Sequence, residues 1–143
     1  MGKVYGIDAS PDMIARAKAK AGKAGLDILF EKESIHALPF PDGQFDAVLS
    51  TLMLHHLPRK LREDGIREIR RVLRPGGRVL VIDFGGTETQ RGLLAHLHRR
   101  HGHVKRSDVV ALLGWAGLNV VESDAMGIKD LHFTLATARC CKA

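Results

Sequence analysis

The sequence predicts an α/β fold with a doubly wound, mostly parallel sheet, and two observations support this prediction. Strand-like and helix-like segments alternate along the 143 residues, which is the pattern of βαβ units. Residues 79–83 read Val-Leu-Val-Ile-Asp, a continuous apolar run that indicates burial on both faces, as in a parallel sheet. Because 45% of the residues are hydrophobic, the chain can bury a core, and we expect a single domain over residues 1–143.

The first expected unit is a strand followed by a capped helix. Residues 4–8 form a short apolar segment that ends on an acid, and Ser10 and Pro11 then supply an N-cap and a proline at the first helical position. Apolar side chains recur at helical spacing up to Gly22 and Gly25, which mark the end of the helix. A strand that runs directly into a helix is therefore expected here.

The rest of the chain continues the alternation. Residues 59–73 place Ile66, Ile69 and Leu73 on one side, as an amphipathic helix should, and the turn 75–77 stops this helix. Ser107 is the expected cap of a last helix that Gly117 closes. The remaining expected elements are strands at 26–32, 45–50, 79–83, 118–122 and 131–138, a loop at 37–43 and a helix over 107–116.

Composition limits the classes of partner. The formal net charge of +6 is compatible with a polyanion, but basic residues mix with acids on the wet side of the 59–73 helix, and aromatic residues for base stacking are scarce. This composition favours a solvent-exposed surface over a nucleic-acid-binding surface. We find no apolar run long enough to span a bilayer and no signal-peptide pattern, so a cytoplasmic location is expected, without a membrane partner.

No metal site is expected from the cysteines or histidines. Cys140 and Cys141 are adjacent at the tail, whereas disulfide frameworks and zinc sites need spaced ligands. Four histidines have mixed spacing among arginines, without an accompanying acid or thiolate, and fit a basic surface better than a metal site. These histidines are His96, His98, His101 and His103.

Asp8 is the first candidate for a binding residue. An acid at the carboxyl end of a strand, directly before a capped helix, is how a doubly wound fold presents a carboxylate to the hydroxyls of a nucleotide ribose. Aspartate is also an ordinary residue at a helix entry, so this position alone leaves both interpretations open.

Three stretches in order give Asp8 a context: VYGIDASPDMIARAKAKA, ALPFPDGQFDAVLSTLMLHHLP and EIRRVLRPGGRVLVIDF. Together they resemble the class I S-adenosylmethionine-dependent methyltransferases, in the methyltransferase type 11 branch that includes ubiquinone and menaquinone biosynthesis enzymes. The resemblance extends from Val4 to about Arg139. It implies a Rossmann-like fold, S-adenosylmethionine as cofactor, and methyl transfer to a small-molecule acceptor. Nicotinamide-binding proteins of similar fold lack the LPFPDGQFD and LRPGG pair.

The resemblance also assigns cofactor-binding residues. Asp8 would hold the ribose hydroxyls, and Ala9 with Met13 would lie near the adenine or ribose. Ser34 and Ile35 occupy the positions where the family has an acid and a small apolar residue against adenine. Ser50 and Thr51 would face the methionine portion of the cofactor. No catalytic residue is assigned.

Other positions are expected to serve the substrate or the fold. His55 and His56 would open the next helix close to the substrate side, although a histidine pair after an apolar run more often caps and packs. Phe40 and Phe45 would anchor a loop on the sheet, and the stretch 96–106 would help to recognise the acceptor.

The sequence departs from the family at its start. The stretch that begins at Met1 corresponds to the family's second strand, so the first strand, its glycine-rich turn and the following helix are absent from it. That strand would be central, between the strands that end at Asp8 and Ser50. We therefore expect a domain incomplete at its N-terminal side, cofactor binding that is weak or lost, and exposed sheet edges that favour a homo-oligomer. The alternative is a non-catalytic methyltransferase-fold remnant that acts through a protein interface or as a dimer.

Overall fold

The computed structural model describes residues 2–85, 104–128 and 130–139. The chain forms two compact units, Met1–Pro39 and Phe40–Ala143, and each is described by itself. The four histidines of the 96–103 stretch and both cysteines lie outside the described residues. Among the described residues, no helix has both the length and the apolar composition needed to cross a membrane.

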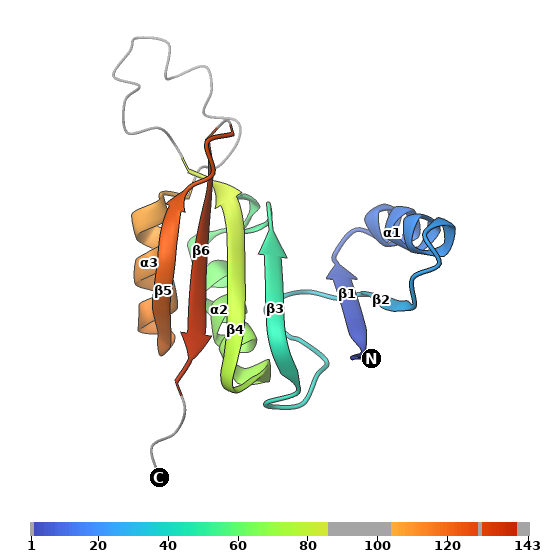
Figure 1. Ribbon diagram of the computed structural model, residues 1–143, viewed down its shortest axis with the longest axis horizontal. Coiled ribbons are helices and arrows are strands. Elements are labelled where there is room, and N and C mark those ends of the chain that lie inside the picture. The colour runs from blue at the N-terminus through green and yellow to red at the C-terminus, as the bar shows by residue number, and fades with distance from the viewer. Residues whose placement is uncertain (1, 86–103, 129, 140–143) are drawn as a thin grey trace. The chain divides into compact units, whose positions relative to one another are not determined.

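The first unit is a parallel βαβ motif made of β1 (Val4–Asp8), α1 (Pro11–Lys23) and β2 (Ile28–Lys32) (Figure 1). The predicted local signals are confirmed. The Ser10 hydroxyl accepts a hydrogen bond from the Met13 backbone N–H at 3.4 Å, and Pro11 is the first residue of the helix. Gly25 has a φ of +64°, a conformation that glycine adopts without strain just after a helix.

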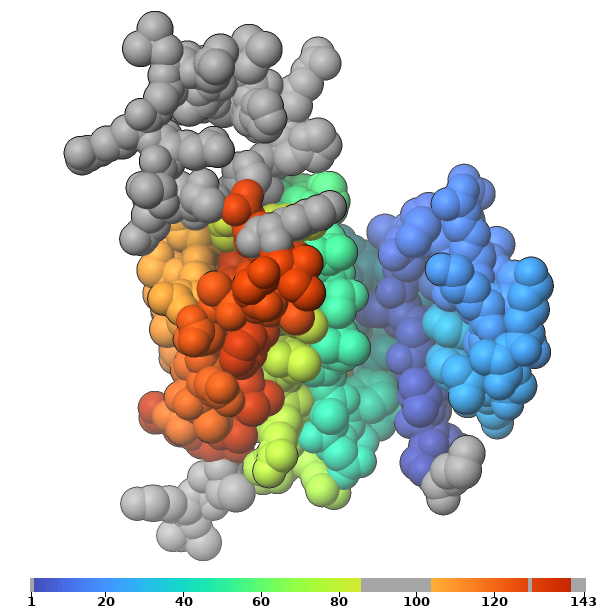
Figure 2. Space-filling view, turned by 45° about the horizontal axis from the view of Figure 1, so that its top comes forward, coloured from blue at the N-terminus to red at the C-terminus, as the bar shows by residue number. Residues whose placement is uncertain are grey.

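The second unit is a four-stranded sheet in the order β3-β4-β6-β5. Strands β3 and β4 are parallel, and β6 runs antiparallel to both β4 and β5. Figure 1 shows the two helices of this unit on the same face of the sheet, and Figure 2 shows the strands side by side. The elements are β3 (Phe45–Thr51), the 3-10 helix η1 (Leu54–His56), α2 (Arg59–Val72), β4 (Leu73–Phe84), α3 (Arg106–Trp115), β5 (Leu118–Ala125) and β6 (Leu131–Ala138).

The core of the second unit lies between the sheet and its helices. Ile66 and Ile69 of α2 are buried at helical spacing, which confirms the predicted apolar side of this helix. Alternate residues of β4, Val79 and Val81, are also buried. The residues between them on β4 are half-buried, so the prediction that this strand is buried on both faces is wrong for the described residues. The described helices of this unit, α2 and α3, lie on one face of its sheet.

Three other details differ from the sequence-based expectations. The turn at 75–77 lies within β4, where Gly76 has a φ of +77° and the register against β3 shifts, so the strand begins directly after α2. Lys105, not Ser107, precedes α3, and Ser107 lies within its first turn. Strand β6 is antiparallel, a pairing set by long-range contacts that the spacing of apolar residues does not encode. The α/β fold class itself is confirmed, whereas a single domain over the whole chain stays a prediction.

Candidate functional site

Asp8 lies at the carboxyl end of β1 and is fixed there by its own turn. Its Oδ1 atom accepts a hydrogen bond from the Ser10 backbone N–H at 2.8 Å. The Asp8 carbonyl oxygen accepts another from the Glu33 backbone N–H at 3.2 Å, which joins the segment after β2 to the end of β1. The second carboxylate oxygen, Oδ2, has no hydrogen-bond partner among the described residues. One oxygen therefore holds the turn while the other is available to a ligand.

The other predicted residues of the first unit follow the carboxyl ends of β1 and β2 in the sequence. Ala9 is exposed, and Met13, in the first turn of α1, is 50% exposed. Ser34 and Ile35 are half-buried just after β2, whose end is paired with Asp8 through Lys32. The Ser34 hydroxyl is hydrogen-bonded to His36 Nδ1 at 2.7 Å. Because β1 and β2 are parallel, their carboxyl ends bring Asp8 and the segment that contains Ser34 to one edge.

Ser50 and Thr51 end β3 in the second unit. Ser50 is 6% exposed, and its buried hydroxyl has no partner among the described residues. The next residue, Leu52, has a φ of +53°, and its backbone N–H donates to the Ile82 carbonyl oxygen at 2.8 Å. A leucine in this left-handed region is strained, and such strain is common at ligand-binding positions. The carboxyl ends of parallel strands are also where open α/β sheets bind ligands.

A buried acid, Asp83, lies at the carboxyl end of the neighbouring strand β4. Its Oδ2 atom accepts hydrogen bonds from the backbone N–H groups of Leu54 at 2.8 Å and His55 at 3.3 Å. Its Oδ1 atom accepts one from the Phe84 backbone N–H at 2.8 Å and lies 2.5 Å from His55 Nδ1. Asp83 is fully buried and His55 is 8% exposed. This carboxylate therefore fixes η1 to the end of β4.

Asp83 was not among the site residues predicted from the sequence, although the sequence contains a signal for it. Residues 79–83 end on an acid in the same way as residues 4–8, at the end of an apolar strand. The interaction of Asp83 with His55 crosses 28 positions, which apolar periodicity does not predict. His55 was expected near the substrate side, and its partner was not foreseen.

His132 on β6 is the cross-strand partner of Asp83. It is 4% exposed, and neither ring nitrogen has a hydrogen-bond partner among the described residues. Burial lowers the pKa of His132 below its usual 6.5, and the nearby Asp83 carboxylate opposes this effect only in part. Gly85 approaches the ring so closely that a Cβ atom there would lie 2.6 Å from its Nδ1 atom. A larger residue at this position would therefore force the His132 ring to shift.

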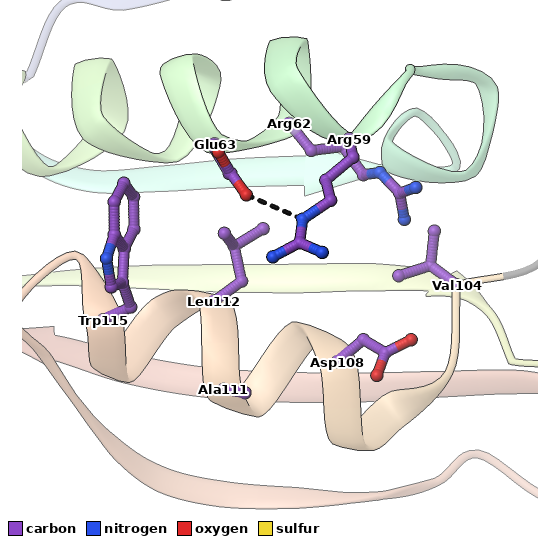
Figure 3. A pocket seen from close by; sticks show the side chains of 8 residues that line it. All are labelled: Arg59, Arg62, Glu63, Val104, Asp108, Ala111, Leu112 and Trp115. Atoms are coloured by element: carbon purple, nitrogen blue, oxygen red, sulfur yellow. Dashed lines mark hydrogen bonds and ion pairs between the residues drawn. The ribbon is translucent and has the colours of Figure 1, made fainter.

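A groove of about 420 Å³ lies between α2 and α3, and none of the predicted site residues lines it (Figure 3). Arg59 and Glu63 of α2 form an ion pair at 2.9 Å on one side of it, and Trp115 and Leu112 of α3 lie on the other. It is a surface groove between two helices, not a pocket at the carboxyl edge of the sheet. No cluster of histidine, cysteine or acidic side chains in the described ranges could hold a metal ion.

The sequence pattern of the methyltransferase domain family matches residues 1–81, more than half of the chain. The chain belongs to this methyltransferase domain family. It is 40% identical over 98 residues to the 27-O-demethylrifamycin SV methyltransferase of Amycolatopsis mediterranei, a match that covers 67% of this chain and 35% of that protein. It is 42% identical over 82 residues to the demethylmenaquinone methyltransferase of Thermus thermophilus, covering 57% and 36%. The matched region thus spans about a third of each relative.

Solved structures of methyltransferases share the fold. A SAM-dependent methyltransferase from Methanosarcina mazei matches 96% of this chain and 82% of its own, with a TM-score of 0.79 and 22% identity. One from Aquifex aeolicus matches 95% of this chain and 69% of its own, with a TM-score of 0.76 and 26% identity. The Rossmann-like fold expected for this methyltransferase domain is therefore confirmed, and the cofactor that the family and these neighbours imply is S-adenosylmethionine.

Two side chains of the methyltransferase domain fit the chemistry of this cofactor. The free Oδ2 atom of Asp8 is an acceptor suited to a ribose hydroxyl, and the buried Ser50 hydroxyl lacks a partner among the described residues. A buried hydroxyl without a partner is costly unless a ligand or water satisfies it. Ser34 fits less well, because its hydroxyl is already bound to His36.

Proposed function

We propose that this domain binds S-adenosylmethionine and transfers its methyl group to a small-molecule acceptor. The observation that supports the proposal most is the position of Asp8 at the carboxyl end of β1, in a chain that belongs to the methyltransferase family. When bound, the cofactor would supply the methyl group on an electrophilic sulfonium. Asp8 would then hold the ribose, with Ala9 and Met13 beside the nucleoside.

The remaining predicted residues complete this proposal. Ser34 and Ile35 would lie against the adenine, and Ser50 and Thr51 would contact the methionine portion. Methyl transfer needs the methyl carbon in line with the attacking atom in a site from which water is excluded, so positioning determines the rate. The acceptors named for the two relatives, a demethylated rifamycin and a demethylmenaquinone, are both small molecules, which supports a small-molecule acceptor here.

The comparisons give no support to the alternative of a non-catalytic remnant. A homo-oligomer stays a prediction, and it is supported by the edge of β3 that has no partner strand among the described residues. Strand β3 pairs only with β4 among the described residues, and Leu49 on β3 is 64% exposed. Unpaired edges of this kind are usually covered or paired in an assembly.

Calorimetric titration with S-adenosylhomocysteine tests the proposed cofactor site. We expect the Asp8→Ala variant to lose affinity about tenfold or more, because hydrogen bonds to a charged group contribute about 1.5–3 kcal/mol. The Asp8→Asn variant should have intermediate affinity, since its amide oxygen can still accept the Ser10 N–H. Asp12→Ala, an exposed acid in the first turn of α1, is the matched control and should bind like the wild type. Equal affinity of wild type and Asp8→Ala would disprove the role of Asp8.

A further inference from the structure

The groove between α2 and α3 has a charged end and an apolar end. Its volume of about 420 Å³ lies within the range of small-molecule sites. Figure 3 shows the guanidinium group of Arg62 near Val104 at one end of the groove and the Trp115 ring at the other, with Leu112 between them. A ligand that lies along the groove would therefore meet a cation at one end and apolar side chains at the other.

Arg62 provides the charged end, and one of its donors is unsatisfied. The Nε atom of Arg62 is buried and has no hydrogen-bond partner among the described residues. A buried donor without an acceptor destabilises the folded protein. The neighbouring Arg59 differs, because its Nε atom donates to Glu63 at 2.9 Å and its side chain is 89% exposed. Arg62 is therefore the cation of the groove that an acceptor atom of a ligand would satisfy.

Trp115 provides the apolar end. It is 55% exposed, although large aromatic residues usually bury most of their surface. The guanidinium carbon of Arg67 lies 4.7 Å from the centroid of the Trp115 ring, a cation–π contact that orients the ring toward α2. Leu112, three positions earlier in α3, lines the same groove and is half-buried. Exposed apolar side chains that line a groove are typical of binding sites.

The acids of the groove limit the charge that a ligand can carry. Glu63 is already paired with Arg59, and Asp108 is exposed in the first turn of α3. Both carboxylates would repel a polyanion, whereas Arg62 alone can balance a single negative charge. A carboxylate suits Arg62 best, because guanidinium donors form two parallel hydrogen bonds to its two oxygens. The lining of the groove thus favours a monocarboxylic acid over a doubly charged phosphate.

We propose that the α2–α3 groove is a second small-molecule site, which binds a monocarboxylic acid with an aromatic or branched apolar body. In this site Arg62 donates through Nε and a terminal nitrogen to the carboxylate, and the apolar body packs against Leu112 and Trp115. The site is separate from the proposed cofactor site, since none of the predicted cofactor-binding residues lines the groove. It does not depend on the proposed methyl transfer.

Fluorescence of Trp115 measures binding in the groove, because this residue is the only tryptophan of the chain. We expect 3-phenylpropionate, added to the full chain, to change the Trp115 emission in a saturable way. The neutral 3-phenylpropionamide has the same apolar body and should bind about tenfold or more weakly, since it lacks the charge that Arg62 balances. The cationic 3-phenylpropylamine should cause no saturable change over the same range of concentrations.

Substitutions at Arg62 test the role of this side chain. Arg62→Gln should bind the acid and the amide with similar affinity, because the positive charge is lost. Arg62→Lys keeps the charge without the planar guanidinium, so its preference for the acid should be intermediate. Arg70→Gln, on the same helix but outside the groove, is the matched control and should keep the wild-type preference. Circular dichroism identifies any variant that does not fold, and the wild-type titrations test the site without the variants.

Equal affinities of the wild type for the acid and the amide would overturn the proposal, and so would no saturable change with the acid. An Arg62→Gln variant that keeps the wild-type preference would also overturn it. If Trp115 emission depends on protein concentration without any acid, a second copy of the chain covers the groove and the proposal fails. S-adenosylhomocysteine should not displace the acid, and displacement would show that the groove is not a separate site.

Discussion

Asp83 and His132 are paired residues on adjacent strands, and they have opposite hydrogen-bond environments. Asp83 accepts three backbone N–H groups and contacts His55 Nδ1, whereas His132 has no partner for either ring nitrogen among the described residues. Burial therefore favours the neutral form of His132, and its pKa is lowered. Protonation of the His132 ring is therefore less favourable in the folded state than in the unfolded chain.

This difference predicts how stability depends on pH. Because the pKa of His132 is lower in the folded state than the usual 6.5, the unfolded state binds more protons as pH falls below that value. The unfolding free energy should thus be highest above pH 6.5 and should fall as the pH drops below it. Urea unfolding at several pH values measures this dependence.

The His132→Leu variant should show a smaller decrease over the same pH range, because it removes the group that must be protonated. His36→Leu, at an exposed position, controls for the loss of an imidazole. If His132→Leu reproduces the wild-type pH dependence, the burial of His132 does not contribute to it.

The turn between β3 and η1 directly follows the predicted site residues Ser50 and Thr51. Leu52 is held at a φ of +53° by its hydrogen bond to Ile82, and Asp83 then fixes the first two backbone N–H groups of η1. The neighbouring strand β4 therefore determines the shape of this turn. The strain at Leu52 costs of order 1 kcal/mol and is maintained by these contacts.

Substitutions at Leu52 measure this strain. Glycine adopts a positive φ without a steric penalty, so Leu52→Gly should be more stable than Leu52→Ala by about 1 kcal/mol. At Met53, with a φ of −121°, the order should reverse, with alanine more stable than glycine by about 0.4–1 kcal/mol. Chemical denaturation of the four variants provides the comparison. A more stable alanine at position 52 would show that this backbone is not strained.

Local signals in the sequence predicted most elements, and long-range pairing accounts for what they missed. Ser10, Pro11 and Gly25 act within a few residues, and so the bounds of α1 follow from them. The antiparallel β6 and the contact of Asp83 with His55 depend on residues that are far apart in the chain. Asp8 was a candidate from its place at a strand end, whereas Asp83, in the same kind of place, was recognised only through its hydrogen bonds.

At the scale of the whole molecule, the proposed cofactor-binding residues come from both compact units. Asp8, Ala9, Met13, Ser34 and Ile35 belong to the first unit, and Ser50 and Thr51 belong to the second. The absence of the family's first strand and glycine-rich turn, and the weak cofactor binding expected from it, both stay predictions. The groove between α2 and α3 is lined by none of the proposed cofactor-binding residues.

Hydrogen–deuterium exchange of the full chain, with and without a high concentration of S-adenosylhomocysteine, tests the central claim most directly. Ligand contacts slow exchange where they stabilise the backbone. We predict slower exchange at residues 8–13 in the first unit and at residues 50–55 in the second, with no change at Arg59, Ala111 and Trp115 along the α2–α3 groove. Unchanged exchange at both predicted segments, or protection confined to the groove, would contradict the assignment of this domain as an S-adenosylmethionine-binding methyltransferase with its site at the carboxyl ends of the strands.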